Sequence, residues 1–99
     1  MPIRVRLHAR FRMAAQSDYI ELPDTVKNVG DVLRELIRGM GSEVSQFIFN
    51  PGTKELSPSL IMLVNGHSIR LLEGPNTPLL EKDVVTIDSV DIMEIVGGG

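Results

Sequence analysis

Residues 28–41, NVGDVLRELIRGMG, contain the clearest helical pattern in the sequence. Asn28 suits the N-cap position, and Asp31 places a carboxylate near the positive end of the helix. Gly39 and Gly41 are stop signals. Together these features predict a helix over about residues 29–39. Its apolar stripe has the i, i+3, i+4, i+7 spacing and comprises Val29, Val32, Leu33, Leu36, Ile37 and Met40.

Before this helix, apolar and polar residues alternate, which is typical of half-buried strands. The first predicted strand covers nine positions, from Ile3 to Phe11. Its inward row is Ile3, Val5, Leu7, Ala9 and Phe11, and its outward row is Arg4, Arg6, His8 and Arg10. A polar connection leads to a second strand at residues 19–22, which Pro23 ends. Two adjacent short strands predict an antiparallel hairpin.

After the helix, residues 42–49 predict a short turn, and three further strand signals follow. The apolar run at residues 60–64 is followed by Asn65-Gly66, a tight-turn pair. Residues 69–72 predict a short return strand, and residues 83–88 another strand that the apolar residues 92–96 continue or extend. The long helix can act as a crossover, so that a later strand lies parallel to the first.

The composition excludes several classes of protein. A chain of 99 residues fits one compact domain, and a net charge of −3 does not favour nucleic acid. The absence of cysteine removes disulfides, thiolate catalysis and most zinc sites. His8 and His67 have no evident ligand partners, so we expect no metal. No apolar run is long enough for a membrane helix and no signal peptide is evident, so we expect a cytoplasmic protein.

Several short motifs, in this order, resemble the ubiquitin-like β-grasp family of sulfur carriers and small modifiers. That family includes the molybdopterin synthase small subunit MoaD, the thiazole sulfur carrier ThiS and the small archaeal modifier proteins. The motifs are Leu22-Pro23-Asp24, Phe49-Asn50-Pro51 with Glu55-Leu56-Ser57-Pro58, Leu63-Val64-Asn65-Gly66, Thr77-Pro78-Leu79 with Asp83, and the terminal Gly98-Gly99.

The resemblance implies an α+β, ubiquitin-like β-grasp fold. We expect a mixed sheet of four to five strands with one main helix packed on one face. Residues 1–90 would form the β-grasp domain, and residues 91–99 an extended C-terminal tail ending in Gly-Gly-Gly.

The resemblance also implies a function for this tail. The carboxylate of Gly99 would be adenylated by an E1-like enzyme, with Gly97 and Gly98 as the flexible approach. The activated end would then form an isopeptide bond with target-protein lysines, or become a thiocarboxylate for sulfur transfer with the molybdopterin synthase large subunit. The chain would bind no cofactor, the partner would use ATP, and the chain itself would not be an enzyme. The competing interpretation is a non-reactive β-grasp interaction module with an inert tail.

A partner-binding surface is predicted on the sheet face away from the helix. The resemblance implies a register in which Leu60, Met62 and Val64 point to the helix, and this leaves Ile61 and Leu63 on the open face beside Val84. Exposed contiguous apolar residues often mark an interface. The alternative is that the tail or Met93 covers them.

A basic stripe is predicted along the first strand, made of Arg4, Arg6, His8, Arg10 and Arg12. A solvated face is the favoured interpretation, ahead of docking to an acidic partner. RNA binding is disfavoured because aromatic residues for base stacking are scarce. We therefore expect no nucleic-acid or membrane partner.

Overall fold

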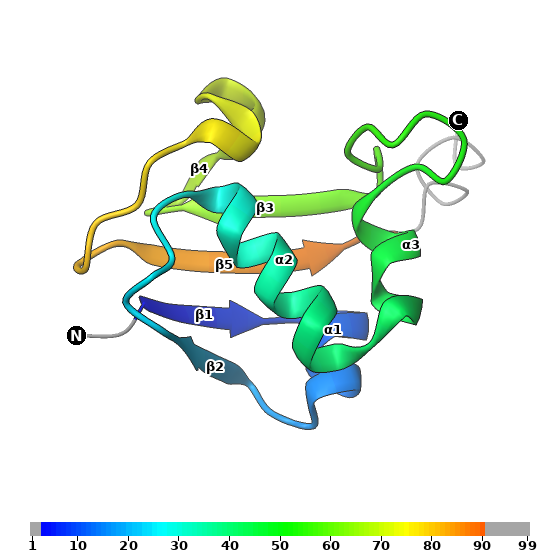
Figure 1. Ribbon diagram of the computed structural model, residues 1–99, viewed down its shortest axis with the longest axis horizontal. Helices are drawn as coiled ribbons and strands as arrows, with labels where there is room; N and C mark the ends of the chain where they lie inside the picture. The colour runs from blue at the N-terminus through cyan, green and yellow to red at the C-terminus, as the bar shows by residue number, and fades with distance from the viewer. Residues whose placement is uncertain (1–2, 91–99) are drawn as a thin grey trace.

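A computed structural model describes residues 3–90 of the chain. It shows a five-stranded mixed sheet crossed by the long helix α2, which confirms the predicted α+β β-grasp architecture (Figure 1). The elements are β1 (Ile3–Leu7), α1 (Ala9–Ala15), β2 (Tyr19–Leu22), α2 (Val29–Met40), the 3-10 turn η1 (Ser42–Val44), α3 (Ser45–Ile48), β3 (Leu60–Val64), β4 (His67–Ser68), the 3-10 turns η2 (Ile69–Leu71) and η3 (Gly74–Asn76), and β5 (Val84–Ser89).

The sheet has the strand order β2-β1-β5-β3-β4. β1 is antiparallel to β2 and parallel to β5, while β5 is antiparallel to β3. The parallel pair sets Val5 beside Val85, and Leu7 beside Ile87. The crossover expected from the sequence is thus present, since α2 lies between the hairpin and the last strands. The predicted continuation at residues 92–96 lies outside the described residues.

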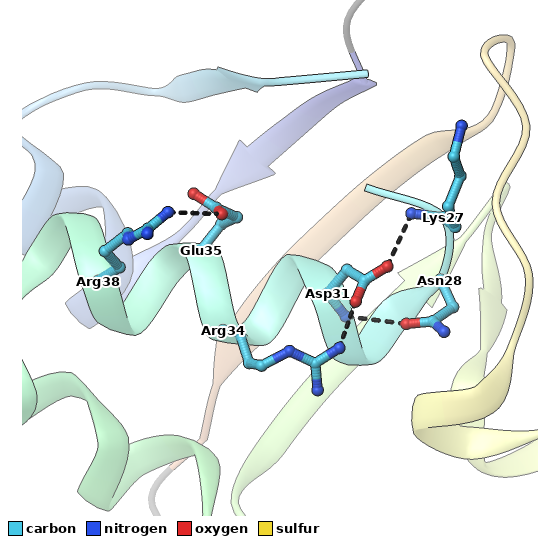
Figure 2. Close-up of polar contacts among 6 residues, drawn as sticks. All are labelled: Lys27, Asn28, Asp31, Arg34, Glu35 and Arg38. Atoms are coloured by element: carbon cyan, nitrogen blue, oxygen red, sulfur yellow. Dashed lines mark hydrogen bonds and ion pairs between the residues drawn. The ribbon is translucent and has the colours of Figure 1, made fainter. Parts of the chain in front are cut away.

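The start of α2 is held by reciprocal capping. Asn28 Oδ1 accepts a hydrogen bond from the Asp31 backbone N–H at 2.9 Å, and an Asp31 carboxylate oxygen accepts one from the Lys27 N–H at 2.9 Å. Figure 2 shows this arrangement with the ion pair between Asp31 and Arg34. These contacts lower the pKa of the Asp31 carboxyl, the Lys27 N–H having the largest effect and Arg34 the next.

The core lies between α2 and one face of the sheet. The first, third and fifth residues of β1 and of β3 are buried, and these are the residues predicted to point inward. Phe11, Ile48 and Ile69 close the core at its margins. The fully buried side chains of largest volume are Phe11, Leu7, Leu33, Leu36, Ile48, Leu60, Met62, Ile69, Ile87, Val5, Val29 and Val32.

The predicted first strand was wrong beyond Leu7. β1 ends there, and Ala9–Ala15 form the helix α1. The chain turns at Ala9, whose φ is +49°, and Ala9 is exposed instead of inward. Phe11 is still fully buried, but from a helix. Phe11 and Ala15 are spaced i, i+4, so this segment satisfies a helical period as well as an alternating one.

The predicted return strand at residues 69–72 was also wrong. Asn65 and Gly66 both have positive φ and close a tight turn, so pairing with β3 begins at once, at His67 and Ser68. Ser68 Oγ then accepts a hydrogen bond from the Arg70 N–H at 3.2 Å and starts the 3-10 turn η2. This turn buries Ile69 completely.

Asn65 joins the end of β3 to the start of β5. Its side-chain amide donates to Asp83 Oδ1 at 2.9 Å, and its Oδ1 accepts from the Val84 N–H at 2.9 Å. The second carboxylate oxygen of Asp83 accepts from the Leu80 N–H at 2.8 Å. These bonds determine where β5 begins.

The capping contacts of Asp31 give a pH prediction. Because the folded-state pKa is lowered, the ionised carboxylate stabilises the fold above the ordinary value of 3.8, and this stability is lost as pH falls through the lower folded pKa. Asp31→Asn should therefore lower the free energy of unfolding at neutral pH, and the difference from wild type should narrow well below pH 3.8. Urea unfolding across pH measures this. Asp18→Asn, which changes an exposed carboxyl, is the control. The prediction is contradicted if the free energies of unfolding of wild type and Asp31→Asn differ by the same amount at every pH.

The Asn65 junction gives a stability prediction. Asn65→Ala removes two side-chain hydrogen bonds and places alanine at φ +53°. We expect a loss of about 1–2 kcal/mol in the free energy of unfolding. Chemical denaturation measures it, with Asn76→Ala as a control that changes an exposed asparagine. Equal stabilities of the two variants would show that the junction contributes nothing.

Candidate functional site: the open sheet face and the tail root

The sheet face opposite α2 presents a continuous row across the strands. The register places Tyr19 beside Arg6, Arg6 beside Thr86, and Thr86 beside Leu63. Leu63 in turn pairs with Ser68 on the edge strand β4. This face therefore runs from a basic and aromatic half on β2 and β1 to an apolar half on β3.

The structure places the three predicted docking residues on this face. Ile61 and Leu63 are half-buried and alternate with the buried positions of β3. Val84 is 56% exposed, but it pairs with Arg4 instead of Leu63, which lies opposite Thr86. Val84 is thus a diagonal neighbour of Leu63 and borders the basic half.

An exposed aromatic residue extends the face beyond what was predicted. Tyr19 is 47% exposed, and the Arg4 guanidinium lies 4.5 Å from its ring centroid. Arg4 also pairs with Glu21 at 3.3 Å. The signal for Tyr19 was present in its outward position in the alternating segment 19–22. Arg6 is exposed and has no ion-pair or hydrogen-bond partner within residues 3–90.

The predicted basic stripe is divided between two elements. Arg4 and Arg6 lie on the open face, whereas Arg10 and Arg12 belong to α1 because β1 ends at Leu7. Arg10 stacks over Phe47 of α3, 4.5 Å from the ring centroid. The prediction that these basic residues form one surface on a single strand is therefore wrong.

The end of the described chain is anchored to β3's lead-in loop. The Val90 N–H donates to the Ser59 carbonyl at 2.9 Å, directly after β5. The tail residues predicted to react, Gly97, Gly98 and Gly99, lie outside the described residues. Val90 is the last described residue, and we call it the tail root because the predicted tail follows it.

Among residues 3–90, no three His, Asp or Glu side chains gather closely enough to hold a metal ion. No helix in that part of the chain is long and apolar enough to cross a membrane.

This sheet, its crossover helix and its exposed face define a ubiquitin-like β-grasp protein. The ThiS family model matches residues 5–99. The chain therefore belongs to the ThiS family, a group of ubiquitin-like carriers and modifiers.

Solved structures agree with this assignment. Small archaeal modifier protein 1 from Methanosarcina acetivorans is 32% identical, with a TM-score of 0.74 over 86% of this chain and 88% of that one. The HVO 2177 protein of Haloferax volcanii is 30% identical, with a TM-score of 0.67 over 88% and 80% of the two chains. CysO from Mycobacterium tuberculosis, at 17% identity, shares the fold with a TM-score of 0.74 over 90% and 99%. Comparison with curated proteins gave no match.

The position of Leu63 predicts the effect of a charge on the open face. Leu63→Asp should weaken docking to an activating enzyme at least tenfold, because a carboxylate would have to be desolvated in an apolar contact. The fold should persist, since Leu63 points away from the core. Titration calorimetry against the enzyme and circular dichroism measure the two effects.

Leu80→Asp is the matched control for that experiment, because Leu80 is 72% exposed and belongs to no strand of the sheet. If wild type and Leu63→Asp bind the activating enzyme with equal affinity, this face is not the docking surface.

Proposed function

We propose that this chain is a ubiquitin-like carrier whose C-terminal Gly99 carboxylate is activated by an E1-like adenylating enzyme. The observation that supports this most is a β-grasp body formed by residues 3–90, which precedes the sequence Gly97-Gly98-Gly99. Membership in the ThiS family supports the same role. The chain acts as substrate of its partner, which supplies the catalytic residues and uses ATP.

The chemistry explains why activation is needed. A carboxylate is a poor acyl donor because it is anionic and has no good leaving group. Attack of a Gly99 carboxylate oxygen on the α-phosphorus of ATP releases pyrophosphate and forms an acyl adenylate. A nucleophile then attacks the acyl carbon and expels AMP. Gly97 and Gly98 carry no Cβ, so they pass a narrow channel without shielding that carbon.

The body is needed for docking as well as for presentation. Ordering a flexible segment at an enzyme costs free energy, so contacts from a rigid surface must offset it. The open face offers apolar area from Ile61, Leu63 and Val84. Arg6 adds a charge whose side chain has no ion-pair partner within residues 3–90. We propose this face as the docking surface for the adenylating enzyme.

Two fates of the activated end have separate support. The 32% identity to an archaeal modifier protein supports attachment to target-protein lysines through an isopeptide bond. The ThiS family match supports conversion to a terminal thiocarboxylate and sulfur transfer. A role beside the molybdopterin synthase large subunit stays a prediction from the sequence resemblance. Both fates begin with the same acyl adenylate, so one carrier can serve both.

Intact mass spectrometry tests the proposal. After incubation with ATP and an adenylating enzyme, the protein should gain the mass of one adenylyl group, which is AMP minus one water. When a sulfur donor is present, its mass should instead rise by the difference between one sulfur and one oxygen atom. A variant lacking Gly98 and Gly99 should show neither change while keeping the wild-type circular dichroism. If the wild-type mass is unchanged with every cognate enzyme, the chain is an interaction module with an inert tail.

The two fates can be separated in cells. Immunoblots against the chain should reveal conjugates of high mass if lysines are the acceptors, and these should disappear with the truncated variant. Sulfur transfer would be favoured by a different pair of results. A strain in which the gene for this chain is deleted would be depleted of a sulfur-containing cofactor, and the wild-type strain would show no conjugates.

A further inference from the structure

The loop that anchors the tail root has its own internal bonding. Leu60 N–H donates to the Ser57 carbonyl at 3.0 Å, and the Ser59 N–H donates to Ser57 Oγ at 3.2 Å. The hydroxyls of Ser57 and Ser59 lie 2.8 Å apart. The Ser59 carbonyl is the group that accepts from Val90. The position of Val90 therefore depends on how firmly residues 57–60 are held.

One side chain from a distant segment bridges this loop. Arg70 Nη1 donates to the Leu60 carbonyl at 2.9 Å, and Arg70 Nη2 donates to the Ser57 carbonyl at 2.7 Å. Its guanidinium thus contacts the residues on both sides of Ser59. The planar fork of arginine suits two acceptors at once, and hydrogen bonds from a charged donor are stronger than neutral ones.

The short edge strand explains why the Leu60 carbonyl needs a side-chain partner. β4 pairs only with Leu63 and Val64, so within residues 3–90 the first part of β3 has no neighbouring strand on that side. The 3-10 turn η2 runs past this gap and carries Arg70. Unpaired strand carbonyls are otherwise open to water or to another chain. Arg70 donates to the Leu60 carbonyl at this edge and to the Ser57 carbonyl of the preceding loop. The same loop contains Ser59, whose carbonyl accepts from Val90.

We propose that Arg70 is a positioning residue for the reactive C-terminus: by clamping residues 57–60, it fixes the point from which the tail departs. The inference rests on the proposed function, since it concerns delivery of Gly99 to the adenylating enzyme. Nine residues follow Val90, and at up to ~3.5 Å each they reach roughly 30 Å. Because the distance from Val90 to Gly99 has this upper limit, a fixed position of Val90 raises the effective concentration of the carboxylate at a docked active site.

This role differs measurably from a contribution to docking. The open face binds through Leu63 and its neighbours, whereas Arg70 acts after docking. Arg70→Ala should therefore lower kcat for adenylation about tenfold and leave KM for the carrier within about twofold. Arg70→Lys keeps the charge but loses the fork, so its kcat should lie between those of wild type and Arg70→Ala.

The experiment combines ATP–pyrophosphate exchange, at varied carrier concentration, with amide hydrogen exchange of the carrier alone. In Arg70→Ala, the Val90 amide should exchange about tenfold faster, while the Val5 and Val85 amides in the sheet centre exchange as in wild type. Arg38→Ala is the control, because it removes an arginine side chain that makes a polar contact elsewhere, the ion pair on α2 with Glu35 at 3.3 Å (Figure 2). It should change neither measurement.

The outcomes separate cleanly. The proposal is overturned if Arg70→Ala has the wild-type kcat for adenylation. It is also overturned if the Val85 and Val90 amides exchange faster by the same factor, since this indicates a general loss of stability. If Arg70→Ala does not fold, Arg70→Lys decides by the same two measurements. If wild type itself supports no pyrophosphate exchange, the proposed function fails, whereas the Val90 amide still reports whether Arg70 anchors the tail root.

Discussion

The parallel pairing of β5 with β1 is the constraint on which the rest of the structure depends. A tight turn can join two antiparallel strands, but parallel neighbours require a crossover. The chain meets this requirement with α2, whose apolar stripe then covers one face of the sheet. The pairing also places the last described strand at the sheet centre, between β1 and β3. The segment that precedes the C-terminus is therefore supported on both sides (Figure 1).

The alternation within β3 and β5 gives the sheet two faces with different tasks. Met62 and Ile87 are completely buried against the helix side, whereas Leu63 and Thr86 lie on the other face of the same strands. Within residues 3–90, α2 covers one face of the sheet only, and the second face is the proposed docking surface. The predicted alternative, in which the tail or Met93 covers that face, lies outside the described residues.

Local signals explain which parts of this arrangement were predictable. The helix α2 was correctly predicted because its cap, stripe and stop signals all agree. The first strand was overextended because Phe11 suits both an alternating and a helical period, and no glycine marks the positive φ at Ala9. The family register placed Ile61, Leu63 and Val84 on the open face, and the observed burial patterns of β3 and β5 agree with that placement. The role of Arg70 was not predictable, because its carbonyl partners lie 10 and 13 residues earlier and depend on tertiary packing.

Most of the motifs behind the family resemblance have a structural role. Some of their residues fix the start of β5, the strand that connects the body to the predicted tail. Asn65 and Asp83 fix the start of β5, while the Ser59 carbonyl holds the residue just after its end. The same strand carries Val84 and Thr86 on the open face. A partner that docks on that face therefore also determines where the root at Val90 lies relative to its own active site. Recognition of the body and delivery of the C-terminus are consequently coupled through one strand fixed at both ends.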